Sequence, residues 1–172
     1  IQFRVYSATA DEVKDRMENG LLDMGLLMMP VEVQKYSYIS MPYQERWCAL
    51  VREDSPLAQL TSVTPADLLP YPLILSWREQ VSEQVREWFG ESFSQVKIAA
   101  RYNLITNTAI MVKHRVGVAL CYDLGTTYYN SLRLVPLSPS MENGAVLAWK
   151  KEQARSRAVE QFITHIKEST RV

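Results

Sequence analysis

Features that would place this chain in a special class are scarce or missing. Its 172 residues include only two cysteines and two histidines, and 19 basic side chains balance 19 acidic ones. Without a basic excess, the segment lacks the electrostatic footprint of a nucleic-acid-binding surface. No apolar run approaches the roughly 20 residues that a membrane helix needs, and no charged start leads into an apolar secretory signal. These absences favour a soluble globular domain without a membrane or nucleic-acid partner of its own.

Catalytic and metal-binding motifs are missing as well. The two histidines, His114 and His165, fall on separate predicted helices, so no histidine–cysteine cluster has the spacing of a metal site. No G-x-S-x-G elbow, P-loop or dinucleotide fingerprint occurs. Cys48 and His114 can be drawn as a nucleophile pair, but a cysteine in an apolar strand is inert by default. We therefore expect no enzymatic activity, no cofactor and no metal.

What the chain does have is an ordinary globular composition, 47% hydrophobic and 22% charged, enough for one sizeable core or two small lobes. Strand-like and helix-like segments alternate without repeats, which predicts an α/β fold. The predicted strands are residues 1–6, 23–28, 36–41, 45–52, 72–75, 96–101, 118–121, 132–135 and 145–149. The predicted helices are residues 10–19, 65–69, 76–91, 103–116, 124–129 and 154–168.

Several helix starts have clear capping signals. Thr9 and Glu12 match the capping box, and Thr64 precedes a proline at the first helical position. Ser76 and Asn103 are predicted N-caps, because their short side chains can accept from free backbone N–H groups.

The stretch from residue 103 to 123 combines such a helix start with a strand. His114 and Arg115 suit the negative end of the helix dipole, and Gly117 leads into an apolar run typical of a strand buried on both faces. A polar helix start beside a buried strand is how open α/β sheets build ligand clefts. The pattern therefore indicates binding rather than catalysis.

Cys48 and Cys121 lie far apart in the sequence, and each sits in an apolar strand. One interpretation is two reduced core thiols in a cytoplasmic protein. The other is a redox-sensing pair, although Arg46 is the only flanking positive charge that would lower a thiol pKa.

Several landmarks, taken in order, resemble the effector-binding domain of LysR-type transcriptional regulators over the whole chain. The aspartate-containing strand at 22–26 and the turn at 52–58 match this family. So do the helix and strand at 65–68 and 72–74, the passage around a glycine at 112–120, and the closing helix at 158–166. Two positions depart from the family pattern: Arg115 stands where a second glycine is usual, and Tyr122 stands where proline is frequent.

The resemblance implies a periplasmic-binding-protein-like fold, in which two Rossmann-like lobes are joined by crossing hinge strands. Lobe one would comprise residues 1–52 and 122–172, and lobe two residues 53–121, with crossings near 51–52 and 120–122. It also implies that a helix-turn-helix domain, a linker helix, and the first strand and helix of lobe one precede Ile1. That first strand would lie between residues 1–6 and 23–28, and its absence leaves exposed strand edges.

By the same resemblance, a small effector binds between the lobes. Helix N-termini converging there offer free N–H groups and positive partial charge, so a carboxylate-bearing effector is the best match. Hydroxyls would fix its orientation and apolar side chains would contact its body. The candidate residues are Ser7, Thr9, Met28 and Met29 in lobe one, and Ser76, Trp77, Asn103, Ile105 and Thr106 in lobe two.

Each candidate also has a purely structural explanation. The hydroxyl and amide side chains can simply cap helices, and Trp77 can simply pack within its lobe. Met28 and Met29 suit a core, and Arg78 suits either a ligand carboxylate or a solvated helix face.

The leading hypothesis is therefore the ligand-sensing domain of a cytoplasmic LysR-type regulator that binds DNA only through its missing helix-turn-helix domain. Such effector domains form dimers, within tetramers of the full-length protein, and residues 1–6 and 76–91 are the expected contact segments. The alternative is an extracytoplasmic solute-binding protein of a transporter. An enzyme on the same two-lobe fold is a third possibility, without residues to support it.

Overall fold

The computed structural model describes residues 2–123 and 130–170, and it has the α/β class that the sequence predicts. The chain divides into two compact units. Unit 1 comprises residues 1–44 and 144–172, and unit 2 comprises residues 45–143. The predicted helix at 124–129 lies outside the described residues.

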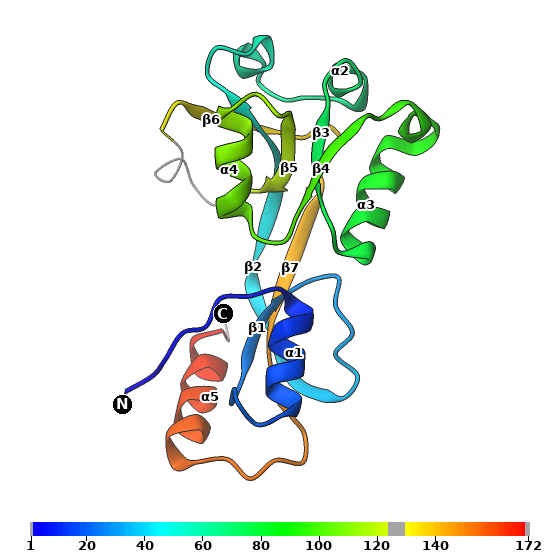
Figure 1. Cartoon of the computed structure of the whole chain (residues 1–172). Helices are drawn as coiled ribbons and strands as arrows, with labels where there is room; N and C mark the ends of the chain where they lie inside the picture. Colours follow the sequence, from blue (N-terminus) through cyan, green and yellow to red (C-terminus); the bar gives the residue numbers. More distant parts are fainter. Residues whose placement is uncertain (1, 124–129, 171–172) are drawn as a thin grey trace. The chain divides into compact units, whose positions relative to one another are not determined.

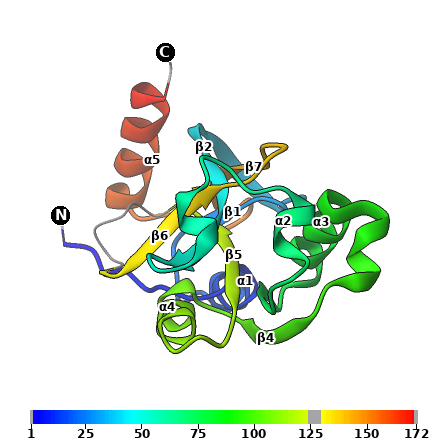
Figure 2. The ribbon, with the colours of Figure 1, turned by 90° about the horizontal axis from the view of Figure 1, so that it is seen from above.

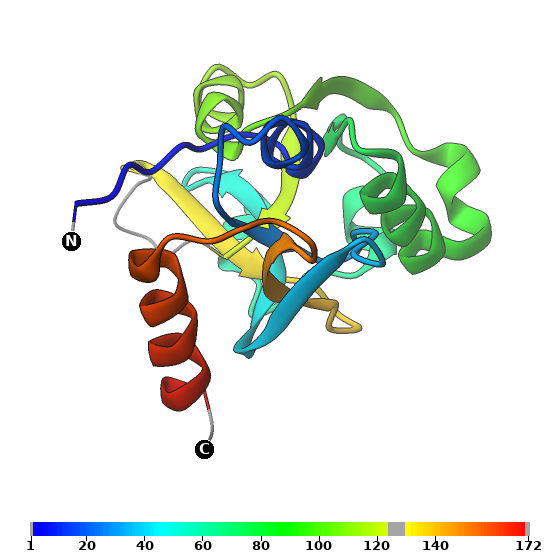
Figure 3. The ribbon, with the colours of Figure 1, turned by 90° about the horizontal axis from the view of Figure 1, so that it is seen from below.

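Unit 1 is built on an antiparallel pair of strands. Strand β1 (Gly25–Met28) pairs with β7 (Glu142–Lys150), and alternate residues of β7 point to opposite faces. Helix α1 (Ala10–Glu18) packs on one face through Val13 and Met17, and helix α5 (Arg157–Ser169) packs on the other through Val159 and Ile163 (Figure 3). Each helix buries only one apolar stripe, as its sequence spacing requires.

Unit 2 contains a mixed sheet in the order β6-β2-β5-β3-β4. Strand β3 (Leu73–Ser76) is parallel to both β4 (Ile98–Tyr102) and β5 (Val118–Tyr122), whereas β2 (Tyr36–Arg52) is antiparallel to β5 and to β6 (Leu132–Pro136). The shorter elements are α2 (Pro65–Leu68) and the 3₁₀ helices η1 (Pro56–Gln59) and η2 (Gly90–Gln95).

Helices cover both faces of this sheet. Leu73 and Leu75 belong to the core under α3 (Glu79–Phe89), and Ile74 belongs to the core under α4 (Ile105–Lys113). Figures 1 and 2 show the two helices on opposite sides of β5. Burial on both faces explains why β3 and β5 are continuous apolar runs rather than alternating ones.

The sequence prediction of a strand at residues 1–6 is wrong. Residues 2–9 have no regular secondary structure, and Phe3 and Val5 are more than four-fifths exposed. Alternating apolar residues make pairing possible, but a strand also needs a neighbour. Within the described residues β1 pairs only with β7, so residues 2–6 have none.

The strands predicted at 36–41 and 45–52 form one 17-residue strand, β2, that runs through Pro42. Proline has a strand-compatible φ and removes one backbone donor, so it need not end a strand. The strand passes from unit 1 to unit 2 between Gln44 and Glu45. The return occurs between Asn143 and Gly144 in β7, rather than near residues 120–122.

Residues 130–143 accordingly belong to unit 2, whereas the sequence analysis assigned them to lobe one. The reason is a long-range pairing: β6 runs antiparallel to residues 48–52 of β2. Its Val135 and the following Leu137 join the core under α3. Such a pairing has no local sequence signal.

The turn between α4 and β5 depends on backbone geometry at two residues. Arg115 has a φ of 60°, in the left-handed region, at the position where the LysR family usually has glycine. Gly117 approaches Pro72 so closely that a Cβ atom there would collide with the Pro72 carbonyl group. The amide of Val118 donates to that same carbonyl at 2.9 Å, which ties the start of β5 to β3.

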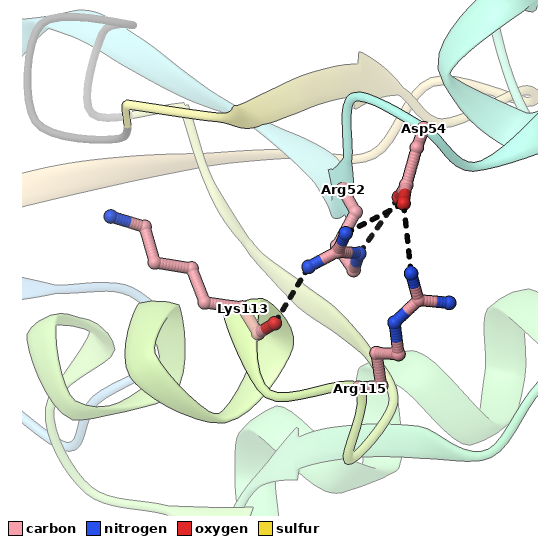
Figure 4. A network of polar contacts seen from close by, with 4 residues as sticks. All are labelled: Arg52, Asp54, Lys113 and Arg115. Atoms are coloured by element: carbon pink, nitrogen blue, oxygen red, sulfur yellow. Dashed lines mark hydrogen bonds and ion pairs between the residues drawn. The ribbon is translucent and has the colours of Figure 1, made fainter.

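A polar network fastens this turn to the end of β2 (Figure 4). Arg52 donates to both carboxylate oxygens of Asp54, at 2.7 and 2.6 Å, and to the Lys113 carbonyl oxygen at 2.7 Å. Arg115 reaches the same carboxylate at 3.0 Å. Hydrogen bonds from Arg52, together with the charges of both arginines, hold the pKa of Asp54 below its ordinary value of 3.8.

Replacing Gly117 with alanine tests the close approach of β5 to Pro72. We expect Gly117→Ala to lower the free energy of unfolding by about 1–3 kcal/mol, because a backbone carbonyl cannot move aside as a flexible side chain can. Gly144→Ala is the matched control, since its added methyl group meets no atom within 4 Å. Equal stabilities of the two variants in urea denaturation would contradict this packing.

Replacing Asp54 with asparagine tests the polar network through its pH dependence. A carboxylate with a lowered folded-state pKa stabilises the protein above its unfolded-state pKa and loses that effect as the pH falls through the folded-state value. The wild-type melting temperature should therefore exceed that of Asp54→Asn by a constant amount at pH 5–7, and the gap should close below about pH 4. Asp23→Asn, at an exposed carboxylate, is the charge-matched control. A gap that persists at pH 2–3 would count against the network.

Candidate ligand-binding site

Three parallel strands of unit 2 end at one edge of the sheet. Ser76 of β3 lies opposite Tyr102 of β4, and the register of β3 with β5 places Tyr122 close to the same level. Ligands of open α/β sheets bind at the carboxyl ends of the strands. This edge is therefore the candidate site, and it collects residues from three separate parts of the chain.

The helices that follow β3 and β4 begin at this edge without side-chain caps. Helix α3 starts after Arg78 and α4 starts after Leu104, and neither N-cap residue makes a capping hydrogen bond. The predicted caps Ser76 and Asn103 are therefore wrong. Each lies one or two residues too early: Ser76 Oγ accepts from the amide of Arg78, and Asn103 Oδ1 accepts from the amide of Leu104.

Helix α1 in unit 1 is different, because its N-terminus is fully capped as the sequence predicts. The Thr9 amide and hydroxyl donate to the Glu12 carboxylate at 2.9 and 2.8 Å, and Thr9 accepts from the Glu12 amide. These hydrogen bonds lower the pKa of Glu12. A carboxylate of the chain already occupies this helix start, so a ligand anion is better accommodated at α3 and α4.

The remaining predicted residues have mixed surroundings. Ser7 is exposed, and Met28 and Met29 are half-buried, with Met29 packed against the core of unit 1. In unit 2 Trp77 is 56% exposed, Thr106 is exposed, and Ile105 packs on the core under α4. The structure thus brings five of the predicted residues together at the edge in unit 2: Ser76, Trp77, Asn103, Ile105 and Thr106.

Two arginines add positive charge at this edge. Arg101 donates to the Ser76 carbonyl oxygen at 3.2 Å and to Ser82 Oγ at 3.0 Å. Arg78 is half-buried rather than on a solvated helix face. Burial raises the pKa of Tyr122 to about 12, and the charge of Arg78 acts on the same hydroxyl in the opposite direction.

A polar group that was not among the predicted site residues lies beside this edge, formed by Trp47, Tyr122 and Asn143. Trp47 Nε1 donates to Asn143 Oδ1 at 2.5 Å, and the Tyr122 hydroxyl donates to the same oxygen at 3.4 Å. The Trp47 and Tyr122 rings lie 4.7 Å apart. These residues come from β2, β5 and β7, so no sequence spacing links them.

Cys48 and Cys121 face each other as paired residues of β2 and β5, and both are 1% exposed. Burial raises the pKa of Cys48 to about 11 and also raises the pKa of Cys121. Thiolates, the reactive form, are therefore scarce at neutral pH. This environment favours inert core thiols over a redox-sensing pair.

Other kinds of site find little support in the described part of the chain. No group of three or more acidic, histidine or cysteine side chains is placed to hold a metal ion, and no helix has the length and apolar content to cross a membrane. A surface hollow of about 680 Å³ is lined by residues such as Glu53, Gln59 and Arg133. It lies at the opposite end of the strands and its polar walls are exposed, so we place the candidate site at the carboxyl edge.

Comparison with known proteins identifies one family. A family model described as the LysR substrate binding domain matches residues 1–171. The chain is 22% identical over 171 residues to the uncharacterized HTH-type transcriptional regulator YvbU of Bacillus subtilis, covering 98% of this chain and 57% of that protein. It is 23% identical over 171 residues to the Hca operon transcriptional activator HcaR of Escherichia coli, covering 94% of this chain and 56% of that protein.

Among solved structures, the effector binding domain of QuiR in complex with shikimate has the same fold. Its TM-score is 0.80 at 19% identity, and the match covers 98% of this chain and 81% of that one. The chain spans little more than half the length of the two curated relatives.

The cysteine environment predicts how the thiols react. In the folded protein neither Cys48 nor Cys121 should react with Ellman's reagent at pH 7.5 within minutes, because both are buried and largely protonated. Both should react at once in 6 M guanidinium chloride. Rapid release of one or two equivalents of chromophore from the folded protein would revive the redox interpretation.

Proposed function

This chain belongs to the LysR substrate-binding domain family, and we propose that its unit 2 binds a small carboxylate effector at the carboxyl ends of β3, β4 and β5. The family makes it the effector-binding regulatory domain of a LysR-type transcriptional regulator. It also favours this role over a transporter-linked solute-binding protein.

The observation that carries the carboxylate proposal is the pair of uncapped helix starts at one sheet edge. Free amides at the starts of α3 and α4 offer hydrogen-bond donors and positive partial charge. Arg78 adds a full charge close by. The start of α1, by contrast, is capped and has the acidic residues Asp11 and Glu12 in its first turn, so it disfavours an anion.

Apolar contact for the rest of the ligand comes from the same edge. Trp77 presents an exposed ring large enough to cover a planar or cyclic body, and Ile105 lies at the start of α4. Ser76, Asn103 and Thr106 supply polar groups that can fix orientation. The QuiR domain supports this chemistry, because its ligand shikimate is a cyclic carboxylate. The candidates in unit 1, Ser7, Thr9, Met28 and Met29, stay predictions.

We also propose the wider role of the whole protein from its relatives. A helix-turn-helix domain elsewhere in the protein would bind DNA in the cytoplasm, and the effector domains would form dimers within a tetramer. The effector would act by its differential affinity for two states of the regulator. Because the exposed residues 2–6 do not form a strand, they would contact the partner domain of the dimer in a way other than as a strand.

A thermal-shift screen tests the proposed ligand class. Shikimate, benzoate, cinnamate and citrate should include a ligand, whereas the corresponding amides should not bind. At 100 times its Kd such a ligand adds about 2.7 kcal/mol of stability, a rise of about 5–10 °C in melting temperature for a chain of this size. Stabilisation by uncharged amides alone would refute the carboxylate class.

Arg78→Gln should weaken binding of the best carboxylate at least about tenfold, because a charge-assisted contact is lost. Arg86→Gln, in the last turn of the same helix, removes the same charge away from the edge and should leave the Kd unchanged. Equal effects of the two substitutions in calorimetric titration would show that only net charge matters.

A further inference from the structure

The Asn143 side chain is the least expected polar group beside the proposed site. It is one of four buried polar side chains in the described residues, at 6% exposed, and it is the last residue of unit 2 on β7. Its oxygen accepts from two donors, Trp47 Nε1 and the Tyr122 hydroxyl. Its amide nitrogen donates to no other residue in the part of the chain that the structure describes.

The orientation of this amide is chemically determined. An indole N–H is a donor only, so the Asn143 atom 2.5 Å from Trp47 must be the oxygen. Trp47 is 2% exposed and packed in the core, so it holds the amide in one orientation. The NH₂ group is therefore fixed on the side away from Trp47, with two N–H donors to satisfy.

The position of the amide connects it with the carboxyl edge of the sheet. Tyr122 is the last residue of β5, where the parallel strands end, and its hydroxyl reaches the Asn143 oxygen. Arg78 follows β3, whose last residue Ser76 lies close to the level of Tyr122 at the same edge. An amide donor with fixed orientation, next to a cationic edge, is suited to an oxygen acceptor that brings negative charge.

We propose that the Asn143 amide, held by Trp47, donates to a carboxylate oxygen of the effector and is a specificity-determining residue of the site. This inference rests on the proposed function and adds a residue from β7 to the candidates on β3, α3 and α4. It also assigns Trp47 a positioning role, because Trp47 acts only through the asparagine.

A merely structural Asn143 would serve Trp47 alone, and one substitution separates the two roles. Asn143→Asp keeps an oxygen for the indole N–H and replaces the NH₂ donor with a second, negatively charged oxygen. A structural role predicts little change in the Kd of a carboxylate ligand on this substitution. A role in binding predicts loss of a donor and repulsion of a ligand carboxylate.

The experiment is calorimetric titration of the purified wild-type and Asn143→Asp proteins with benzoate and shikimate. Tryptophan emission and melting temperature, measured without ligand, report on the fold of each protein, because all four tryptophans contribute to the emission. We expect the Kd of the bound carboxylate to rise at least about tenfold in the variant while the emission maximum stays unchanged. Asn143→Thr, which has an oxygen but no amide donor, replaces the aspartate variant if the latter does not fold.

The outcomes distinguish this inference from the function on which it depends. If wild type binds a carboxylate and the folded variant binds it with the same Kd, the role of Asn143 is overturned and the proposed function stands. If wild type binds neither probe nor any carboxylate of the thermal-shift panel, the proposed function fails and the inference fails with it. Weakened binding that is accompanied by a shifted emission maximum would assign Asn143 to the structural role and overturn the proposal.

Discussion

The parallel pairing of β3 with β4 and β5 is the constraint on which unit 2 depends. It brings Ser76, Tyr102 and Tyr122 from three parts of the chain to one edge of the sheet. The pairing requires β5 to start directly against the backbone of Pro72, and only glycine at position 117 permits that approach. The left-handed backbone at Arg115 and the arginines around Asp54 fasten the same turn. The geometry of the site thus depends on packing at the opposite end of the strands.

Local signals in the sequence predicted most of the elements. The capping box at Thr9 and the Thr64 cap before Pro65 mark helices that the structure contains, and the apolar runs at 73–75 and 118–121 form strands buried on both faces. These predictions succeeded because a cap or a periodic pattern acts over a few residues. The family was recognisable for a related reason: its landmarks keep their order along the chain, and the family match covers residues 1–171.

The failures involve partners far away in the sequence. Residues 1–6 alternate in sequence as a strand does, but residues 2–6 have no neighbouring strand within the described part of the chain. Strand β6 belongs to unit 2 because it pairs with β2. The cap predictions at Ser76 and Asn103 failed because their side chains accept from the amides of Arg78 and Leu104, the residues that precede the first turn of each helix. The group of Trp47, Tyr122 and Asn143 could not be predicted, because three strands must assemble before its hydrogen bonds exist.

The central claim is that a ligand anion meets the uncapped starts of α3 and α4. Backbone amide chemical shifts, followed by NMR while a bound carboxylate is titrated, test it most directly. The account predicts the largest shifts at residues 79–81 and 105–106, with little change at residues 10–13 of the capped α1. Shifts concentrated around Gln59 and Arg133, at the opposite end of the strands, would contradict it.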